Sequence, residues 1–397
     1  MVKDKSLKER IEVLKRDFKR TFGDTKGIKI FNAPGRVNII GEHTDYNGGY
    51  VLPIAINLSI LGVARKTKDR KLHLKSKNFE REFEVSLDEL KYDEKIGWAN
   101  YPLSIAWVLQ KEGLKINGAE IIFEGNIPVA SGLSSSAAIE VLTMKILLEL
   151  SGETIEEEKI PILCRKAENE FIGVKSGIMD QFVITFGKKD NALFLNCETL
   201  DFRLIPFHNM KNKEIIIGNT KIKRALVKSA YNERLRECSE GLEILKKCLK
   251  RKEIKNLSCI KKEEFEEYKK FLPLLIAKRC EHVIYENERV LQAVDSLEKG
   301  DLNKLGELMI LSHKSLKDLY EVSSPELDIM VSGFLKSEGV YGARMTGAGF
   351  GGCTIALIEK SFREEIIKRV SKEYEEKTNI KGEFYVSQAS DGARKIN

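Results

Sequence analysis

The sequence lacks any long hydrophobic run. No stretch of its 397 residues approaches the roughly 18–20 consecutive apolar residues that a membrane-spanning helix needs. The first residues are charged throughout and lack the apolar core of a secretory signal, so we expect a cytoplasmic protein. With 42% hydrophobic and 32% charged residues, the chain has enough apolar surface for large cores, and its length favours two domains over one.

Cysteine patterns typical of disulfide frameworks or metal sites are also missing. The seven cysteines are scattered, none belongs to a Cys-x-x-Cys pair, and their odd number argues against a disulfide framework. The five histidines show no zinc-type spacing with these cysteines. We therefore expect reduced thiols.

The charged residues form no block of one sign. The net charge of +7 arises from 67 Lys and Arg against 60 Asp and Glu, and the two signs are mixed along the chain. Nucleic-acid binding calls for a basic patch with interleaved aromatic residues, which the sequence does not show, so we predict no nucleic-acid partner. The slight positive excess suits anionic ligands such as nucleotides.

Several common phosphate-binding and nucleophile motifs are absent as well. No Gly-x-x-x-x-Gly-Lys-Ser/Thr loop, no Gly-x-Ser-x-Gly elbow and no protein-kinase His-Arg-Asp or Asp-Phe-Gly element occurs. Residues 347–352 match the dinucleotide-binding Gly-x-Gly-x-x-Gly pattern, but the β-prone residues 353–358 follow where that motif requires a helix. We interpret 347–352 as a turn between strands that also walls a ligand site.

The hydrophobic patterns predict a mixed α+β fold, because strands cluster instead of alternating regularly with helices. We place a domain boundary near residue 206, giving domains 1–206 and 207–397, with the final strand able to pack back on the first domain. The region 227–330 is mostly helical. The other predicted elements are helices at 5–22, 101–112, 134–150, 157–172 and 360–376, antiparallel strands at 59–65, 71–76, 81–85 and 119–124, and further strands at 28–32, 50–56, 192–196, 202–206, 214–219, 343–358 (two strands around the glycine turn) and 382–387.

The segment 125–138 combines a strand, a turn and a helix in an order that favours anion binding. Small residues let the backbone approach an anion closely, and Gly132 permits unusual dihedral angles. Residues 134–136 are serines at the predicted helix N-terminus, where free N–H groups and the positive end of the helix dipole favour phosphate. The alternative is a serine-capped helix without a ligand.

The segment 35–49, Gly-Arg-Val-Asn-Ile-Ile-Gly-Glu-His-Thr-Asp-Tyr-Asn-Gly-Gly, is dense in functional groups. Its Arg36, Glu42, His43 and Asp45 can all face one small polar ligand. Carboxylates accept hydrogen bonds from hydroxyl groups and histidine can donate or accept, which suits a sugar. Two alternatives are a solvated turn in which Asp45 makes a local bond, and metal binding by His43 and Asp45, which lacks a third ligand nearby.

Two acids in the middle of the chain are further candidates. Glu168 shares a predicted helix face with Cys164 and Phe171, so we expect its side chain to point inward. A buried carboxylate needs a partner or a cation, and the alternative to a ligand role is an internal salt bridge. Asp180, in Gly-Ile-Met-Asp-Gln-Phe, can be a helix N-cap, or a base or charge stabiliser beside the phosphate loop.

Taken together, these segments resemble the galactokinase family of the GHMP kinase superfamily, over nearly the whole chain. The run 34–49 resembles the galactokinase signature, 128–138 the superfamily's ATP loop, and 345–353 its third, glycine-rich motif. Residues 177–182 are similar to the segment that carries the catalytic aspartate. Residues 229–238 are similar to the segment whose tyrosine contacts the sugar, although Leu235 stands where many relatives have arginine.

The resemblance implies a ribosomal-protein-S5-like N-terminal domain and a ferredoxin-like C-terminal domain, with the active site between them. It implies Mg²⁺-dependent transfer of the γ-phosphoryl group of ATP to the C1 hydroxyl of α-D-galactose, giving galactose 1-phosphate and ADP, the first committed step of galactose metabolism. We expect a monomer or a weak homodimer that contacts neither nucleic acid nor membrane.

The resemblance also implies a role for individual residues. Asp180 is the implied base, Arg36 its partner and transition-state stabiliser, and Ser136 and Glu168 the implied Mg²⁺ ligands. The implied galactose contacts are Glu42, His43, Thr44, Asp45, Gly177 and Tyr231. The implied nucleotide contacts are Ser76, Ala130, Ser131, Gly132, Leu133, Ser134, Ser135 and Ser136.

Two alternative functions stay open at this point. Another sugar kinase of the superfamily, acting on N-acetylgalactosamine or arabinose, has similar motifs, whereas the Glu-His-Thr-Asp run argues against mevalonate. A non-catalytic galactose sensor is the alternative from another class. The complete serine loop, together with Asp180 and Arg36, argues against the sensor.

Overall fold

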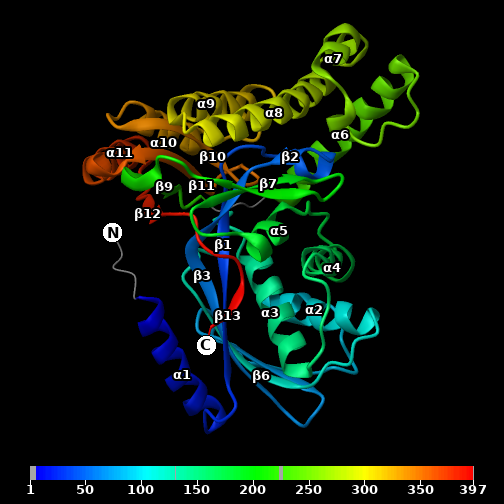
Figure 1. Ribbon diagram of the computed structural model, residues 1–397, viewed down its shortest axis with the longest axis vertical. Helices are drawn as coiled ribbons and strands as arrows, with labels where there is room; N and C mark the ends of the chain where they lie inside the picture. The colour runs from blue at the N-terminus through cyan, green and yellow to red at the C-terminus, as the bar shows by residue number, and fades with distance from the viewer. Residues whose placement is uncertain (1–5, 130, 223–226, 397) are drawn as a thin grey trace.

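The computed structural model describes residues 6–129, 131–222 and 227–396 and shows a two-domain architecture of mixed helices and sheets (Figure 1). The first half of the chain supplies five strands of a six-stranded sheet with helices on both faces, at the bottom of the view. The second half forms a four-stranded sheet and most of the long helices, at the top. The α+β class predicted from the sequence is therefore confirmed.

The six-stranded sheet is hydrophobic on both faces. Its order is β13 (Arg394–Ile396), β1 (Lys29–Asn38), β3 (Pro53–Lys66), β6 (Ala119–Gly125), β4 (Lys71–Ser76) and β5 (Phe83–Ser86). The helices around it are α1 (Leu7–Phe22), α2 (Asn100–Lys111), α3 (Ser135–Ser151), α4 (Lys159–Ala167) and α5 (Met179–Phe186). Helix α1 packs Leu14 and Phe18 against Leu61 and Val63 of β3. Gly62 between them faces α3, because successive side chains of a strand point to opposite faces.

One strand pairing differs from the sequence prediction. Strand β4 runs parallel to β6, with Leu72 opposite Ala119, whereas we predicted antiparallel neighbours. The cause is the connection between them. β4 and β5 form a hairpin at the sheet edge, and the chain then crosses over through α2 before it returns as β6. Such a crossover gives a parallel neighbour.

The four-stranded sheet of the second half is antiparallel throughout. Its order is β10 (Val340–Thr346), β11 (Cys353–Glu359), β9 (Lys213–Asn219) and β12 (Glu383–Ser387). The helices of this half are α6 (Val227–Leu249), α7 (Lys262–Tyr268), α8 (Leu274–Lys299), α9 (Leu302–Asp318), α10 (Pro325–Leu335) and α11 (Arg363–Thr378). Along β9, Ile216 packs toward α10 and α11, while Ile215 and Ile217 belong to the core on the other face.

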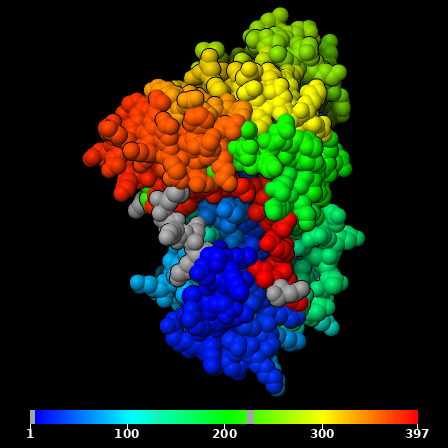
Figure 2. All heavy atoms as spheres, turned by 60° about the vertical axis from the view of Figure 1, so that its left-hand side comes forward, coloured from blue at the N-terminus to red at the C-terminus, as the bar shows by residue number. Residues whose placement is uncertain are grey.

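The end of the chain returns to the first sheet. Strand β13, which the sequence pattern did not reveal, pairs with the outer edge of β1, with Ile396 opposite Ile30. It lies beside β1 in the lower half of Figure 1, and in Figure 2 the red segment passes from the upper to the lower half of the molecule. The boundary that we predict near residue 206 falls at the end of β8 (Phe202–Pro206), where the chain leads on to β9.

A small sheet joins the two halves. It consists of β2 (Tyr50–Val51), β7 (Asn191–Asn196) and β8 (Phe202–Pro206). Strand β2 follows the polar segment 39–49, which leaves the end of β1 and lies against the second half of the chain. There the backbone N–H of Gly41 donates to Glu286 Oε1 at 3.0 Å, and that of Tyr50 donates to Asn287 Oδ1 at 2.9 Å. Helix α8 thus holds a segment of the N-terminal half in place.

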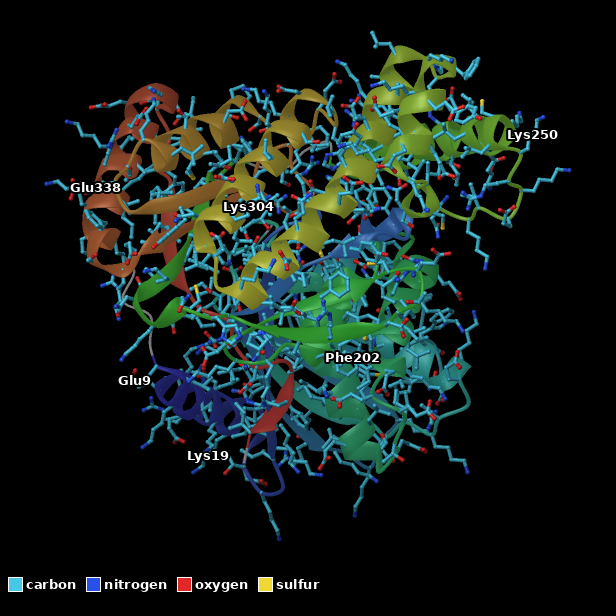
Figure 3. All side chains as sticks on the ribbon, turned by 45° about the horizontal axis from the view of Figure 1, so that its top comes forward. Glu9, Lys19, Phe202, Lys250, Lys304 and Glu338 are labelled. Carbon is cyan, nitrogen blue, oxygen red and sulfur yellow. The ribbon has the colours of Figure 1, made fainter. Side chains whose placement is uncertain are left out.

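The far end of α6, with α7, forms a projection from the body of the protein, and Lys250 is labelled there in Figure 3. This projection lies away from the junction of the two halves. Of the helices that the structure describes, none has the length and apolar character needed to cross a bilayer.

Candidate active site

The serine loop opens onto the N-terminus of α3. Gly132, at φ +85°, and Ser134, at φ 58°, both have left-handed backbone conformations, which turn the chain sharply into the helix. Ser134 is the N-cap residue, but its hydroxyl makes no capping bond and instead donates to the Asp180 carboxylate. The alternative of a serine-capped helix is therefore wrong. The first turn of α3 offers its N–H groups and positive dipole end to an anion.

A bidentate ion pair links β1 to α5. Arg36 Nε and Nη2 donate to the two oxygens of Asp180 at 2.7 and 2.9 Å, and Arg36 Nη1 donates to the Gly132 carbonyl at 2.6 Å. The Arg36 side chain is buried, while 28% of the Asp180 side chain is exposed. Asp180 lies in the first turn of α5 and Ile178 is the N-cap, so the N-cap interpretation of Asp180 is wrong. The pair presents one carboxylate, rigidly held, to the space beside the serine loop.

Two cavities meet at this ion pair. The first has a volume of ≈ 420 Å³ and the second ≈ 560 Å³. Both are lined by Arg36, Ser136, Asp180 and Ala348, so these residues form the junction between them. Ala348 belongs to the glycine-rich turn between β10 and β11, so this turn walls the junction of the two cavities. Two molecules bound in adjoining cavities would face each other across Asp180.

The first cavity is rich in polar groups from both halves of the chain. Glu42 is buried, and its Oε1 accepts hydrogen bonds from the Gly347 N–H at 2.6 Å and the Thr346 hydroxyl at 3.1 Å. Asp45 begins a short 3₁₀ turn and lies against Gly177. A Cβ added to Gly177 would lie 1.6 Å from Asp45 Oδ2, so only glycine fits there.

Burial shifts the titration of several groups in the first cavity. Burial, together with the neighbouring Asp180 and Glu42 carboxylates, raises the pKa of Asp45 to about 7. Burial and the nearby His282 lower the pKa of His43 to about 3. Burial also raises the pKa of Glu42, even though Arg344 and Arg36 oppose the shift. At neutral pH, His43 is therefore an uncharged ring that can donate and accept hydrogen bonds.

The second cavity has an aromatic and aliphatic wall opposite the serine loop. The Phe79 and Trp98 rings are stacked with centroids 6.1 Å apart, and Tyr101 and Phe123 line the same space. Trp98 Nε1 is buried without a hydrogen-bond partner in the described part of the chain. A flat, apolar ring fits this wall, and an acceptor atom at the edge of that ring fits the unpaired Trp98 N–H.

A possible cation position lies beside the junction. Glu168 is buried in a π-helical turn, and its Oε2 accepts hydrogen bonds from the Ser176 hydroxyl at 2.5 Å and from Gln181 Nε2 at 3.1 Å. These partners are neutral, and burial raises the Glu168 pKa, so the salt-bridge alternative is wrong for the described residues. Ser136 and Glu168 line the same cavity. Hydroxyl and carboxylate oxygens are ligands that Mg²⁺ prefers, so this pair fits it.

The structure brings most of the predicted site residues to one of the two cavities. Glu42, His43, Asp45, Ser136, Glu168, Gly177 and Tyr231 line the first, and Ser76, Gly132, Ser134, Ser135 and Ser136 line the second. Three predicted contacts do not line either cavity. Thr44 shares its hydroxyl between the carbonyls of Gly41 and Tyr50, Ser131 donates to the Pro128 carbonyl, and the Leu133 side chain is buried in the core. Ala130 lies outside the described residues.

Comparison with known families and proteins agrees with this geometry. Three family models match: a galactokinase galactose-binding signature at residues 16–66, the GHMP kinases N terminal domain at 100–188 and the GHMP kinases C terminal domain at 293–376. The galactokinase of Fusobacterium nucleatum is 44% identical over 390 residues, covering 97% of this chain and 100% of that protein. The chain belongs to the galactokinase family.

Other relatives and solved structures extend the comparison. The galactokinase of Clostridium acetobutylicum is 46% identical, with 97% of this chain and 98% of that protein covered. The crystal structure of Lactococcus lactis galactokinase complexed with galactose is similar at a TM-score of 0.93, with 41% identity and 97% and 100% of the two chains covered. Methanococcus jannaschii mevalonate kinase shares the fold, at a TM-score of 0.68, 22% identity, and 92% and 99% coverage.

Sequence reasoning missed several residues of this galactokinase-family site. The aromatic wall of the second cavity combines Phe79 with Trp98 and Tyr101, which lie some twenty residues further along the chain around the start of α2, and the three form no known motif in the sequence. In the first cavity, Tyr46 is one of these residues and directly follows Asp45 in the polar segment. Gln181 directly follows Asp180 and links Glu168 to the buried Glu140. The position of Gln181 next to Asp180 was the one feature of the sequence that pointed to it.

The contact of Gly177 with Asp45 yields a first prediction. Gly177→Ala is expected to displace Asp45 and to raise the KM for the sugar at least about tenfold, because small displacements in a site are costly. Steady-state kinetics would measure this. Gly333→Ala is the matched control, since its Cβ would lie 3.4 Å from its nearest neighbour, and it should leave the KM unchanged. An unchanged KM in Gly177→Ala would contradict the role of this contact.

Proposed function

We propose that the first cavity binds galactose, that the second binds ATP, and that Asp180 lies at the point of phosphoryl transfer. As a member of the galactokinase family, the chain is an ATP-dependent sugar kinase. The observation that carries the assignment of the two cavities is that both are lined by Arg36, Ser136 and Asp180. A donor and an acceptor bound on either side of this junction are close enough to react directly.

The chemistry of the first cavity supports a sugar as the acceptor. Glu42 and Asp45 supply carboxyl oxygens, His43 supplies a neutral ring, and Tyr231 supplies a hydroxyl and an aromatic face. Each can exchange hydrogen bonds with a hydroxyl group. Thr44 stays a predicted sugar contact on sequence grounds, although its hydroxyl is engaged by backbone carbonyls.

The second cavity supports a nucleotide. The Phe79 and Trp98 rings form a wall for the adenine ring, and the loop from Gly132 to Ser136 leads the phosphates to the N-terminus of α3. Ser76, at the end of β4, lines the same space. Ser131 and Leu133 would act through the backbone of the loop, since their side chains point elsewhere. Ala130, outside the described residues, stays a predicted nucleotide contact on sequence grounds.

Asp180 is the proposed base for the reaction. Its carboxylate would accept the proton of the C1 hydroxyl of α-D-galactose as the oxygen attacks the γ-phosphorus, giving galactose 1-phosphate and ADP. The two Arg36 hydrogen bonds fix the orientation of the carboxylate, and the Arg36 charge also faces the phosphoryl group in transit. Because phosphoryl transition states are loose, this positioning contributes at least as much as proton removal.

Ser136 and Glu168 are the proposed Mg²⁺ ligands, with ATP phosphates supplying others. Bound there, Mg²⁺ would neutralise charge on the phosphates. Gln181 and Ser176 orient Glu168 through the hydrogen bonds described above. No three His, Cys, Asp or Glu side chains come together as a metal site within 6–129, 131–222 and 227–396.

Two further expectations accompany the proposed function. We also propose a cytoplasmic location and a monomer or weak homodimer. Both rest on the sequence reasoning above.

The choice of galactose is tested by a panel of acceptors. Galactose, N-acetylgalactosamine, arabinose and mevalonate would each be supplied with ATP and Mg²⁺ in a coupled assay of ADP release. Galactose is expected to give the highest kcat/KM. Activity only on another acceptor would overturn galactose as the substrate, and binding of galactose and ATP without ADP release would favour the sensor.

The role of Asp180 is tested by Asp180→Asn, which keeps the shape of the side chain and removes its charge. We expect kcat to fall by about 10²–10⁴-fold, the range for loss of a general base, with circular dichroism showing a retained fold. Asp295→Asn on the exposed surface of α8 is the control and should keep full activity. A kcat near that of the unmodified enzyme would rule out Asp180 as the base.

The role of Glu168 is tested through the Mg²⁺ requirement. Glu168→Gln is expected to raise the Mg²⁺ concentration for half-maximal rate by about 10–100-fold, because an oxygen ligand loses its charge. Initial rates at fixed ATP and varied Mg²⁺ measure this. Glu170→Gln, at an exposed residue that pairs with Lys111, is the matched control. If both variants show the same Mg²⁺ dependence as the unmodified enzyme, Glu168 is not a ligand.

A further inference from the structure

A chain of buried hydrogen bonds runs from the first cavity into the second half of the protein. His43 Nδ1 lies 2.7 Å from the Tyr46 hydroxyl, which lies 2.8 Å from the Tyr320 hydroxyl. The Tyr320 hydroxyl in turn lies 3.2 Å from Cys238 Sγ. His43 and Tyr46 line the cavity, whereas Tyr320 is fully buried outside it. The chain thus connects a proposed sugar contact to a residue that no substrate reaches.

The chemistry of the four groups favours one direction for the hydrogen bonds of this chain. The Tyr320 hydroxyl has two neighbours, and a phenol oxygen is a much better acceptor than a sulfur atom. The distances alone fit either direction; from these acceptor strengths we infer that Tyr320 donates to Tyr46, while the Cys238 thiol, a weak donor, faces the Tyr320 oxygen. The Tyr46 proton is then left to donate to His43 Nδ1. Burial raises the pKa of both tyrosines well above the ordinary value, so both keep their protons.

The consequence for His43 is a fixed tautomer. A neutral imidazole carries one proton, and Nδ1 in this chain is an acceptor, so the proton lies on Nε2. That nitrogen is buried and lies near the Ala348 backbone, but it forms no hydrogen bond of normal geometry in the described part of the chain. An N–H group in this state has its donor capacity available for a ligand oxygen.

Tyr320 is itself held in place from two helices. Its carbonyl accepts a hydrogen bond from Arg234 Nε at 2.7 Å, and the adjacent carbonyl of Leu319 accepts one from Arg279 Nη1 at 2.5 Å. Glu237 bridges the two arginines, with bonds of 3.0 and 2.9 Å. The Tyr320 ring also contacts the His43 ring, at a centroid distance of 4.8 Å. The hydroxyl is therefore at a fixed point when it meets Tyr46.

We propose that Tyr320 is a positioning residue for the acceptor sugar: through Tyr46, it fixes His43 as the Nε2–H tautomer, and His43 then donates to a hydroxyl oxygen of galactose. The inference depends on the proposed function for the identity of the sugar, but the tautomer is a property of the ligand-free protein. No bond is made or broken in this role, and Tyr320 contacts neither substrate.

The tautomer is read directly by ¹⁵N NMR of ligand-free protein with labelled histidine. The chain has five histidines, and His43→Gln assigns the resonances. The unmodified protein is expected to show His43 with a bare Nδ1 and a protonated Nε2. In Tyr320→Phe the Nδ1 signal should move toward the protonated position, because Tyr46 is then free to accept. A protonated Nδ1 in the unmodified protein, or an unchanged spectrum in Tyr320→Phe, would overturn the proposal.

Kinetics provide the second readout. Tyr320→Phe should raise the KM for galactose about 3–10-fold, the range for one hydrogen bond, with a smaller change in kcat because Arg36 and Asp180 are untouched. Tyr374→Phe is the matched control: Tyr374 is equally buried, and its hydroxyl donates to the Thr220 carbonyl at 2.9 Å. Equal KM values in the two variants would contradict the proposal.

A second variant tests the proposal if Tyr320→Phe does not fold. Tyr46→Phe removes the donor to His43 Nδ1, so the His43 Nδ1 resonance should move. An unchanged His43 Nδ1 resonance in Tyr46→Phe would overturn the proposal. The outcomes are also separable from the proposed function. Failure to phosphorylate galactose would refute the substrate assignment while leaving the NMR result in force.

Discussion

The Arg36–Asp180 ion pair is the interaction around which the active site is arranged. It joins strand β1 to the first turn of α5, and a third Arg36 bond reaches the Gly132 carbonyl of the serine loop. A buried arginine is costly unless its donors are matched, and here the carboxylate and carbonyl oxygens match them. The same bonds fix Asp180 at the junction of the two cavities. The interactions that stabilise the buried arginine therefore also hold the proposed base in position.

The second constraint is the burial of the polar segment 39–49 against the C-terminal half. Glu42 is held there by the Gly347 N–H and the Thr346 hydroxyl, its carbonyl accepts from His282 Nε2, and Gly41 donates to Glu286. These contacts come from β10, its glycine turn and α8. The acceptor cavity is thus built from both halves, and the Tyr320 chain adds a further contact from the C-terminal half. Displacing the halves would open the cavity and leave several buried polar groups unmatched.

Much of the fold and site followed from the sequence, because local chemistry decided it. The strand–serine loop–helix order placed residues 134–136 at a helix N-terminus, and Glu168 was correctly expected to point inward. Long-range pairings were harder. The parallel β4–β6 contact and the return of β13 to β1 depend on how the chain crosses over, which no periodicity records. The aromatic wall and the Tyr46–Tyr320 contact join distant residues, so they became visible only in three dimensions.

The central claim is that the acceptor hydroxyl and the phosphoryl donor meet at Asp180, each from its own cavity. A crystal structure of the enzyme with galactose, Mg²⁺ and a non-hydrolysable ATP analogue measures this directly. The account predicts the galactose C1 hydroxyl within hydrogen-bond distance of the Asp180 carboxylate, and the γ-phosphate between the N-terminus of α3 and that hydroxyl. A sugar bound with C1 directed away from Asp180, or a nucleotide outside the aromatic cavity, would contradict it.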